Sequence, residues 1–259
     1  MRIDTFLQEH NYFTSRAKAQ DALREQRVSV NGKRITKSSY QVDESALIEV
    51  EKSELTLASR AGFKLYDAIQ DFDIDLQGRI CIDVGASTGG FSDVCLKKGA
   101  AFVYAIDVGK DQLLPFLKED DRVRNMEGIN CRYLTSEMFK EKPNFACMDV
   151  SFISIKLILP SLLSIMDTKE LVVLIKPQFE AGRQYIGKNG IVKDEKIHIQ
   201  VLSDMLNFIS DLGYYVHHLQ ASSILGRDGN KEFVMHIKET PISRVFPLKQ
   251  IVKEYKVKR

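Results

Sequence analysis

The sequence lacks the features of a membrane, secreted or metal-binding protein. None of its apolar runs approaches the roughly 20 residues that a membrane helix needs, and residues 1–13 contain no apolar secretory core. The cysteines form no CxxC pair, and the histidines form no metal-ligand pattern. We therefore expect a cytoplasmic protein without a metal site, whose buried cysteines stay reduced: Cys81, Cys95, Cys131 and Cys147.

The net charge is small, but positive charge is concentrated at both ends of the chain. The 259 residues carry a formal net charge of only +2. Residues 1–40 contain eight lysines and arginines against four acidic residues, and residues 240–259 contain six against one. Basic ends favour a polyanionic partner, although a solvated surface with a basic tail is an alternative reading of the same pattern.

The first fifty or so residues predict a small domain of helices and a hairpin. Thr14 or Ser15 is suited to cap a helix. A short alternating strand then leads into Asn31-Gly32, a pair typical of a hairpin turn. We expect residues 51–57 to form a linker.

After this segment, apolar runs alternate with helical stretches. The runs cover 80–84, 102–106, 145–150 and 171–175, with further strands expected near 214–219 and 232–237. Continuous apolar strands of this kind are typical of a parallel sheet that is covered by helices on both faces. The sequence therefore predicts an α/β domain.

A glycine-rich loop, DVGASTGGF at 83–91, follows the first of these strands and precedes a helix. Glycines there let the backbone approach a ligand, and the helix start offers free N–H groups. Asp107 ends the next strand, where a carboxylate can accept hydrogen bonds from ribose hydroxyls. The G-x-x-x-G-G spacing differs from the G-x-G-x-x-G of nicotinamide-dinucleotide enzymes and disfavours a dehydrogenase. A generic tight turn is the alternative to a cofactor site.

Four ionisable residues stand at or near the ends of the predicted strands. Asp149 and Lys176 each follow an apolar run, Glu232 opens the last strand, and Lys64 lies on the helix before the first strand. Placing such charges at one buried edge of a sheet costs free energy, so they are expected only where they form ion pairs or take part in a reaction. They therefore indicate either a set of buried ion pairs or a proton-handling cluster.

Five motifs, in order along the chain, resemble one family. They are SRAGFKL at 59–65, DVGASTGGF at 83–91, DVSFIS at 149–154, IKPQFE at 175–180 and KEF at 231–233. Together they resemble the TlyA/haemolysin A family of FtsJ-type ribosomal RNA 2′-O-methyltransferases. The N-terminal segment resembles the S4-type RNA-binding domain of these enzymes. Gln26 and Ala61 stand where family members usually or often have glycine.

The resemblance implies a Rossmann-like class I methyltransferase fold with a mostly parallel seven-stranded sheet, preceded by a small α+β S4-type domain. The expected divisions are 1–57 for the S4-type domain and linker, 58–240 for the methyltransferase domain, and 241–259 for a basic C-terminal tail. The implied activity transfers a methyl group from S-adenosylmethionine to the 2′-hydroxyl of a cytidine in ribosomal RNA. Ribosomal RNA or ribosomal subunits are then the partners.

The resemblance also implies roles for individual residues. Lys176 is the favoured base of a catalytic tetrad made of Lys64, Asp149, Lys176 and Glu232. The implied S-adenosylmethionine contacts are Asp83, Gly85, Ala86, Ser87, Thr88, Gly89, Gly90 and Asp107. The predicted RNA contacts are Ser15, Arg16, Lys18, Lys33, Lys37 and Arg60.

Two other functions fit part of the sequence. A nonenzymatic RNA-binding or ribosome-assembly factor needs only the N-terminal domain, but it leaves the glycine loop and the four ionisable residues unexplained. A membrane-active haemolysin is suggested by the family name, and the lack of long apolar segments argues against it.

Overall fold

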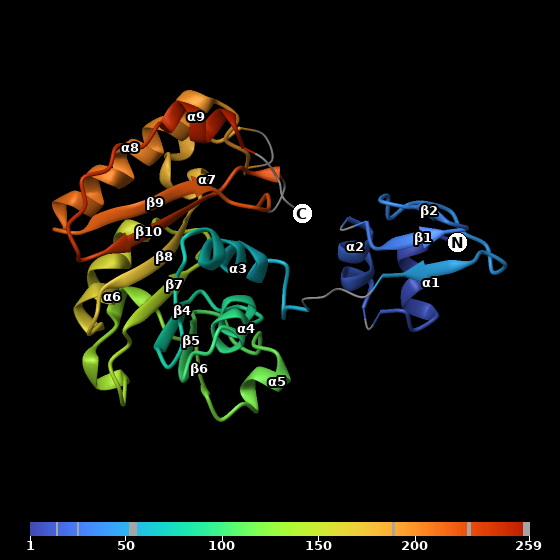
Figure 1. Cartoon of the computed structure of the whole chain (residues 1–259), viewed down its shortest axis with the longest axis horizontal. Helices are drawn as coiled ribbons and strands as arrows, with labels where there is room; N and C mark the ends of the chain where they lie inside the picture. The colour runs from blue at the N-terminus through green and yellow to red at the C-terminus, as the bar shows by residue number, and fades with distance from the viewer. Residues whose placement is uncertain (14, 25, 52–55, 188–189, 227–228, 256–259) are drawn as a thin grey trace. The chain divides into compact units, whose positions relative to one another are not determined.

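The computed structural model divides the chain into two units, Met1–Thr56 and Leu57–Lys258 (Figure 1). It describes residues 1–13, 15–24, 26–51, 56–187, 190–226 and 229–255. Each unit has hydrophobic core residues of its own. The predicted linker at 51–57 falls mostly on residues 52–55, which lie outside the described residues, as does Thr14.

The first unit is a small three-stranded sheet with two helices. Its elements are α1 (Ile3–Glu9), α2 (Arg16–Arg24), β1 (Val28–Val30), β2 (Lys33–Arg34) and β3 (Ile48–Val50), and the strand order is β2-β1-β3. The predicted hairpin turn is confirmed: Asn31 and Gly32 both have positive φ, 49° and 75°, between antiparallel β1 and β2. Gln26 also has a positive φ, 58°, so it adopts the left-handed conformation for which glycine is favoured.

The second unit is built on a seven-stranded sheet of order β6-β5-β4-β7-β8-β10-β9. Its strands are β4 (Ile80–Val84), β5 (Phe102–Asp107), β6 (Val123–Glu127), β7 (Phe145–Met148), β8 (Glu170–Ile175), β9 (Tyr215–Ala221) and β10 (Phe233–Lys238). Neighbours from β6 to β8 pair in parallel, and β10 pairs antiparallel with both β8 and β9. The mostly parallel seven-stranded sheet is thereby confirmed.

Helices cover both faces of this sheet. The helices are α3 (Gly62–Asp71), α4 (Gly90–Lys97), α5 (Pro115–Lys118), α6 (Leu159–Ile165), α7 (Pro177–Glu180), α8 (Glu195–Asp211) and α9 (Leu248–Lys253). Cys81 and Cys147 belong to a core shared with α3, α4 and α5, whereas Ile82 and Met148 belong to one shared with α6 and α8. Alternate residues of each strand thus enter opposite cores, which explains the continuous apolar runs.

Two segments differ from what their composition suggested. β6 has the mostly polar sequence VRNME and only Met126 is buried, because it is an edge strand.

The segment 241–259 was expected to be a basic tail, but α9 packs against the sheet domain instead. Val252 is fully buried in the core around α8, and Tyr255 packs against the same core. Residues 256–259 lie outside the described residues.

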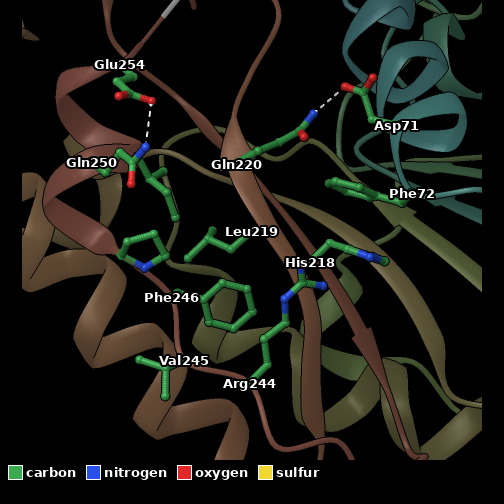
Figure 2. Close-up of a pocket in the computed structure, with 12 residues that line it drawn as sticks. Asp71, Phe72, His218, Leu219, Gln220, Arg244, Val245, Phe246, Gln250 and Glu254 are labelled. Carbon is green, nitrogen blue, oxygen red and sulfur yellow. Dashed lines mark hydrogen bonds between the residues drawn. The ribbon is translucent and has the colours of Figure 1, made fainter.

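A cavity of about 420 Å³ lies beside the outer strand β9 (Figure 2). It is lined by the end of α3, by β9 and by residues 244–254, and it contains none of the predicted site residues. On its wall the ring of His218 stacks on Phe72, with centroids 4.7 Å apart. The His218 Nδ1 atom lies 3.2 Å from Nδ1 of His236, whose Nε2 is 2.9 Å from Glu170.

This histidine pair predicts a loss of stability in mild acid. Burial, followed by the charges of His236, Arg244, His217 and Lys238, lowers the pKa of His218 to about 4, against about 6.5 in an unfolded chain. Between these values the unfolded state binds a proton that the folded state does not. The free energy of unfolding should therefore fall as the pH decreases from about 6.5 to about 4. His218→Gln should make the free energy of unfolding depend less on pH over this range, as measured by urea denaturation at several pH values. A pH dependence equal to that of the unmodified protein would contradict the lowered pKa of His218.

Candidate active site

The glycine-rich loop connects the end of β4 to the start of α4. Its backbone bends through three residues of positive φ: 86° at Gly85, 47° at Ser87 and 92° at Gly89. Ser87 is a non-glycine in the left-handed region, and its N–H donates to Asp107 Oδ2 at 2.8 Å. Gly109 N–H donates to the other oxygen of Asp107 at 2.7 Å. The end of β5 therefore fixes the conformation of the loop.

Two of the loop glycines are required by contacts within the protein. A Cβ at Gly85 would lie 2.6 Å from the carbonyl oxygen of Asp149, so this glycine lets the ends of β4 and β7 approach each other. A Cβ at Gly89 would collide with the side chains of Leu117 and Leu113. The glycine pattern predicted room for a ligand, but in the structure these glycines make room for neighbouring protein segments.

A glycine contact also brings Lys64 to the site. A Cβ at Gly62, the first residue of α3, would lie 2.8 Å from the carbonyl oxygen of Gly90, the first residue of α4. The two helix starts can approach this closely only because both residues lack a side chain. Lys64 follows within the first turn of α3 and is 7% exposed. Helix packing therefore delivers its side chain to the strand ends.

The four predicted catalytic residues form one connected cluster. Lys64 Nζ lies 2.6 Å from Glu232 Oε2 and 3.5 Å from Asp149 Oδ2. Lys176 Nζ lies 2.5 Å from Asp149 Oδ1 and donates a hydrogen bond to Ser151 Oγ at 3.0 Å. Asp149 therefore lies between two lysines, and Lys64 in turn lies between Asp149 and Glu232. None of the four side chains exceeds 13% exposure.

Opposite charges outweigh burial within this cluster. Burial alone would lower the pKa of Lys64, but Asp149 and Glu232 raise it above its ordinary value. Burial alone would raise the pKa of Asp149, but Lys64 and Lys176 lower it. Both groups are therefore charged near neutral pH. The four side chains thus form a buried, ion-paired cluster at the carboxyl ends of β7 and β8.

The β7–α6 connection brings to the site residues that were not among the predicted site residues. Ser151 contacts Lys176 directly. Phe152 is 87% exposed, has a positive φ of 66°, and contacts the ring of Phe179 at 5.2 Å between centroids. Lys176 Nζ in turn lies 6.0 Å from the centroid of the Phe179 ring. An exposed aromatic residue in a strained conformation is unusual enough to mark a functional loop, but the backbone angle is visible only in the structure.

The C-terminal segment supports Glu232 from behind. Glu232 N–H donates to the Tyr255 hydroxyl at 3.3 Å, and that hydroxyl donates to the Ile224 carbonyl oxygen at 3.2 Å. A Cβ at Gly226 would collide with the carboxylate of Glu232. The segment that was expected to be a tail therefore forms part of the wall behind the cluster.

The strand ends next to the cluster fit a nucleoside-containing cofactor. Asp83 is fully buried, and its Oδ2 accepts from Ser92 N–H and Oγ–H at 2.8 Å and 2.7 Å. Its Oδ1 has no hydrogen-bond partner among the described residues. Burial raises the pKa of Asp83 to about 7. Together with the partly exposed Asp107, this gives two carboxylates at adjacent strand ends beside a glycine-rich turn, which is where ligands bind in open α/β sheets.

The predicted RNA-binding residues of the first unit lie on its surface, but Arg16 is also part of an ion pair with a buried carboxylate. Lys18, Lys33 and Lys37 are exposed, and Ser15 Oγ accepts from the N–H of Lys18 at 3.3 Å, as a helix cap does. Arg16 has a structural contact as well, because its Nε lies 2.8 Å from the buried carboxylate of Asp4. Burial would raise the pKa of Asp4, but its hydrogen bonds from Arg2, Gln20 and Arg16 hold it well below its usual range.

Arg60 belongs to the second unit, where it lies two residues before the start of α3 and is half-buried. Among the residues that the structure describes, no helix has the length and apolar character needed to cross a membrane. The same residues contain no group of three or more His, Cys, Asp or Glu side chains placed to bind a metal ion.

Comparisons with known proteins agree with this arrangement. The FtsJ-like methyltransferase family matches residues 57–239, and the S4 domain family matches residues 1–48. "Hemolysin A" of Brachyspira hyodysenteriae is 40% identical over 91% of this chain and 99% of its own length. The "16S/23S rRNA (cytidine-2'-O)-methyltransferase TlyA" of Mycobacterium tuberculosis is 35% identical over 92% of this chain and 89% of its own length.

One solved structure is similar over almost the entire chain. It is described as "Putative hemolysin from Streptococcus thermophilus", is 41% identical, and superposes with a TM-score of 0.76. It covers 98% of this chain and 95% of its own.

The charge arrangement predicts that Asp149 is essential for stability. In Asp149→Asn, the Lys64 amine keeps its charge while the carboxylate beside it is lost. The free energy of unfolding should fall by about 3 to 5 kcal/mol, the usual effect of breaking a buried ion pair. Asp120→Asn is the matched control, because Asp120 pairs with the half-exposed Arg122 and its loss should cost less than about 1 kcal/mol. Urea denaturation measures both, and equal losses would refute the prediction.

Proposed function

The chain belongs to the FtsJ-like methyltransferase family, and from that premise we propose that it methylates ribosomal RNA at a ribose 2′-hydroxyl of a cytidine. The observation that carries this proposal is the buried Lys64–Glu232 and Asp149–Lys176 cluster beside the glycine-rich loop. The names of its relatives support the substrate class, and an S4 domain in the same chain supports RNA binding.

We further propose that the glycine-rich loop and Asp107 hold S-adenosylmethionine. When bound, this cofactor supplies an electrophilic methyl group on a positively charged sulfur. Asp107 is the proposed hydrogen-bond acceptor for the ribose hydroxyls of the cofactor. Each of its oxygens has a lone pair left after accepting one backbone hydrogen bond. The loop from Gly85 to Gly90, with Ala86, Ser87 and Thr88, forms the surface around the cofactor, and Asp83 supports the turn through Ser92.

Lys176 is the proposed base for the 2′-hydroxyl, a role that requires its amine to be in the neutral form before transfer. A hydroxyl attacks a methyl group efficiently only when it is held in line and loses its proton during transfer. The amine of Lys176 is held by Ser151 and Asp149, so its position is fixed on two sides. Asp149 balances the charge that the amine carries after it takes the proton. Lys64 and Glu232 hold Asp149 in place from the other side.

The first unit is the proposed source of RNA affinity. Its exposed lysines can contact phosphates without reading the base sequence, as is usual for electrostatic RNA binding. Ser15, Arg16, Lys18, Lys33 and Lys37 are the proposed contacts, and Arg60 is the proposed contact in the second unit. The target ribose must leave its helical stack to reach a buried amine, at an unstacking cost of a few kcal/mol.

The first test measures methyl transfer directly. Purified protein is incubated with labelled S-adenosylmethionine and ribosomal subunits, and ribose methylation is mapped on the RNA. Arginine in Lys176→Arg has a similar reach but stays protonated and cannot accept a proton near neutral pH, so the single-turnover rate should fall by about 10²-fold or more with cofactor affinity nearly intact. Lys140→Arg, at an exposed position, is the control and should be fully active. A near-normal rate for Lys176→Arg would make Lys176 a positioning cation.

The second test separates the roles of the two units. A protein lacking residues 1–56 retains both cores of the sheet domain and should bind S-adenosylmethionine normally. It should lose RNA methylation, and its residual RNA binding should depend less steeply on salt, because fewer phosphate contacts remain. Calorimetry with the cofactor and RNA titrations at several salt concentrations measure these effects. Full methylation by the truncated protein would refute the division of labour.

A further inference from the structure

The loop after β7 is joined to the segment after β8 at four successive points. Asp149 contacts Lys176, and Ser151 contacts the same amine. The ring of Phe152 meets the ring of Phe179. The last point is Glu180, whose carboxylate receives hydrogen bonds from the beginning of a short 3-10 helix at Ile155–Leu157. The β7–α6 loop is thus held along its length by the β8–α7 segment.

The Glu180 contact is the best defined of these four. Its Oε2 accepts from Ser154 Oγ–H at 2.6 Å, and its Oε1 accepts from Ile155 N–H at 2.9 Å. Ser154 also caps the 3-10 helix by accepting from Lys156 N–H at 3.2 Å. One carboxylate therefore binds both a side chain and the backbone of the same turn, which fixes its position and its orientation.

Between Asp149 and Ser154, the side chains of Val150 and Ile153 pack against the core, but the middle of the loop does not. Ser151 and Phe152 are exposed, and Phe152 has a positive φ, a conformation that is unfavourable for a bulky residue. A strained, exposed loop keeps one conformation only when its ends are fixed. Asp149 fixes the first end through the lysines, and Glu180 fixes the second.

We propose that Glu180 is a positioning residue for methyl transfer, which holds the β7–α6 loop so that Ser151 keeps the Lys176 amine aimed at its target. This proposal rests on the proposed function of Lys176. Both oxygens of Glu180 are occupied by the loop, so the residue acts through Ser151 and Phe152 and does not contact the reacting atoms. Loss of Glu180 should therefore lower the rate of methyl transfer, because a displacement of about 1 Å at a reacting group can reduce a rate by about 10²-fold.

Three variants test the proposal in the full-length protein. Glu180→Ala removes both contacts. Glu180→Gln retains the shape, with an amide oxygen that can accept from Ile155 N–H and an amide group that can donate to Ser154 Oγ. Asp194→Ala is the matched control, since Asp194 likewise caps a helix by accepting from Lys196 N–H at 2.8 Å, but in α8. Single-turnover methyl transfer, cofactor affinity and RNA affinity are measured for each.

The expected result is a selective loss of rate. Glu180→Ala should transfer methyl groups about 10-fold to 100-fold more slowly, with cofactor and RNA affinities within about twofold of the unmodified protein. Glu180→Gln should recover most of the rate, and Asp194→Ala should remain near normal.

Two outcomes would overturn the role of Glu180. One is a normal rate in Glu180→Ala. The other is a parallel loss of rate and cofactor affinity that Glu180→Gln does not rescue, which would indicate general damage. If the unmodified protein itself does not methylate ribosomal RNA, the proposed function fails instead, and the two failures are thereby distinguished.

Discussion

The carboxylate of Asp149, buried between two lysine amines, is the interaction on which the rest of the site depends. A buried charge is tolerated only when opposite charges and hydrogen bonds replace the water that it loses. Asp149 meets this condition through Lys64 and Lys176, and Lys64 through Glu232 as well. Each side chain comes from a different part of the chain. The ion pairs therefore hold the strand ends and α3 together, and they hold the Lys176 amine that we propose as the base.

The sheet and the glycines make this convergence possible. Parallel pairing brings the carboxyl ends of β4, β7 and β8 to one edge, and antiparallel pairing brings the beginning of β10 to the same edge. Gly85 then lets β4 approach the backbone of Asp149, and Gly62 lets α3 approach Gly90. The glycines that resemble a nucleotide-binding signature thus also bring the elements that carry the ion-paired cluster close together. A single loop serves the proposed cofactor site and the assembly of the cluster.

The regions around the site differ in how they are held. The Glu232 backbone is hydrogen-bonded to Tyr255 of the C-terminal segment. The loop after β7 is held by contacts of Ser151 and by Glu180, and its flanking apolar residues pack against the core. The exposed Phe152 lies between those two contacts.

The sequence by itself determined the α/β architecture, the hairpin at Asn31-Gly32, the glycine loop and the identity of the four ionisable residues. These features follow from apolar periodicity, turn chemistry and charges placed at strand ends, all of which are local. It did not reveal β6, because an edge strand buries too little to need an apolar pattern. It also did not show that the basic C-terminus packs behind Glu232, or that Glu180 holds the loop beside Lys176. Only the tertiary structure decided these points, since each depends on contacts between residues far apart in the chain, and such contacts leave no periodic signal in the sequence.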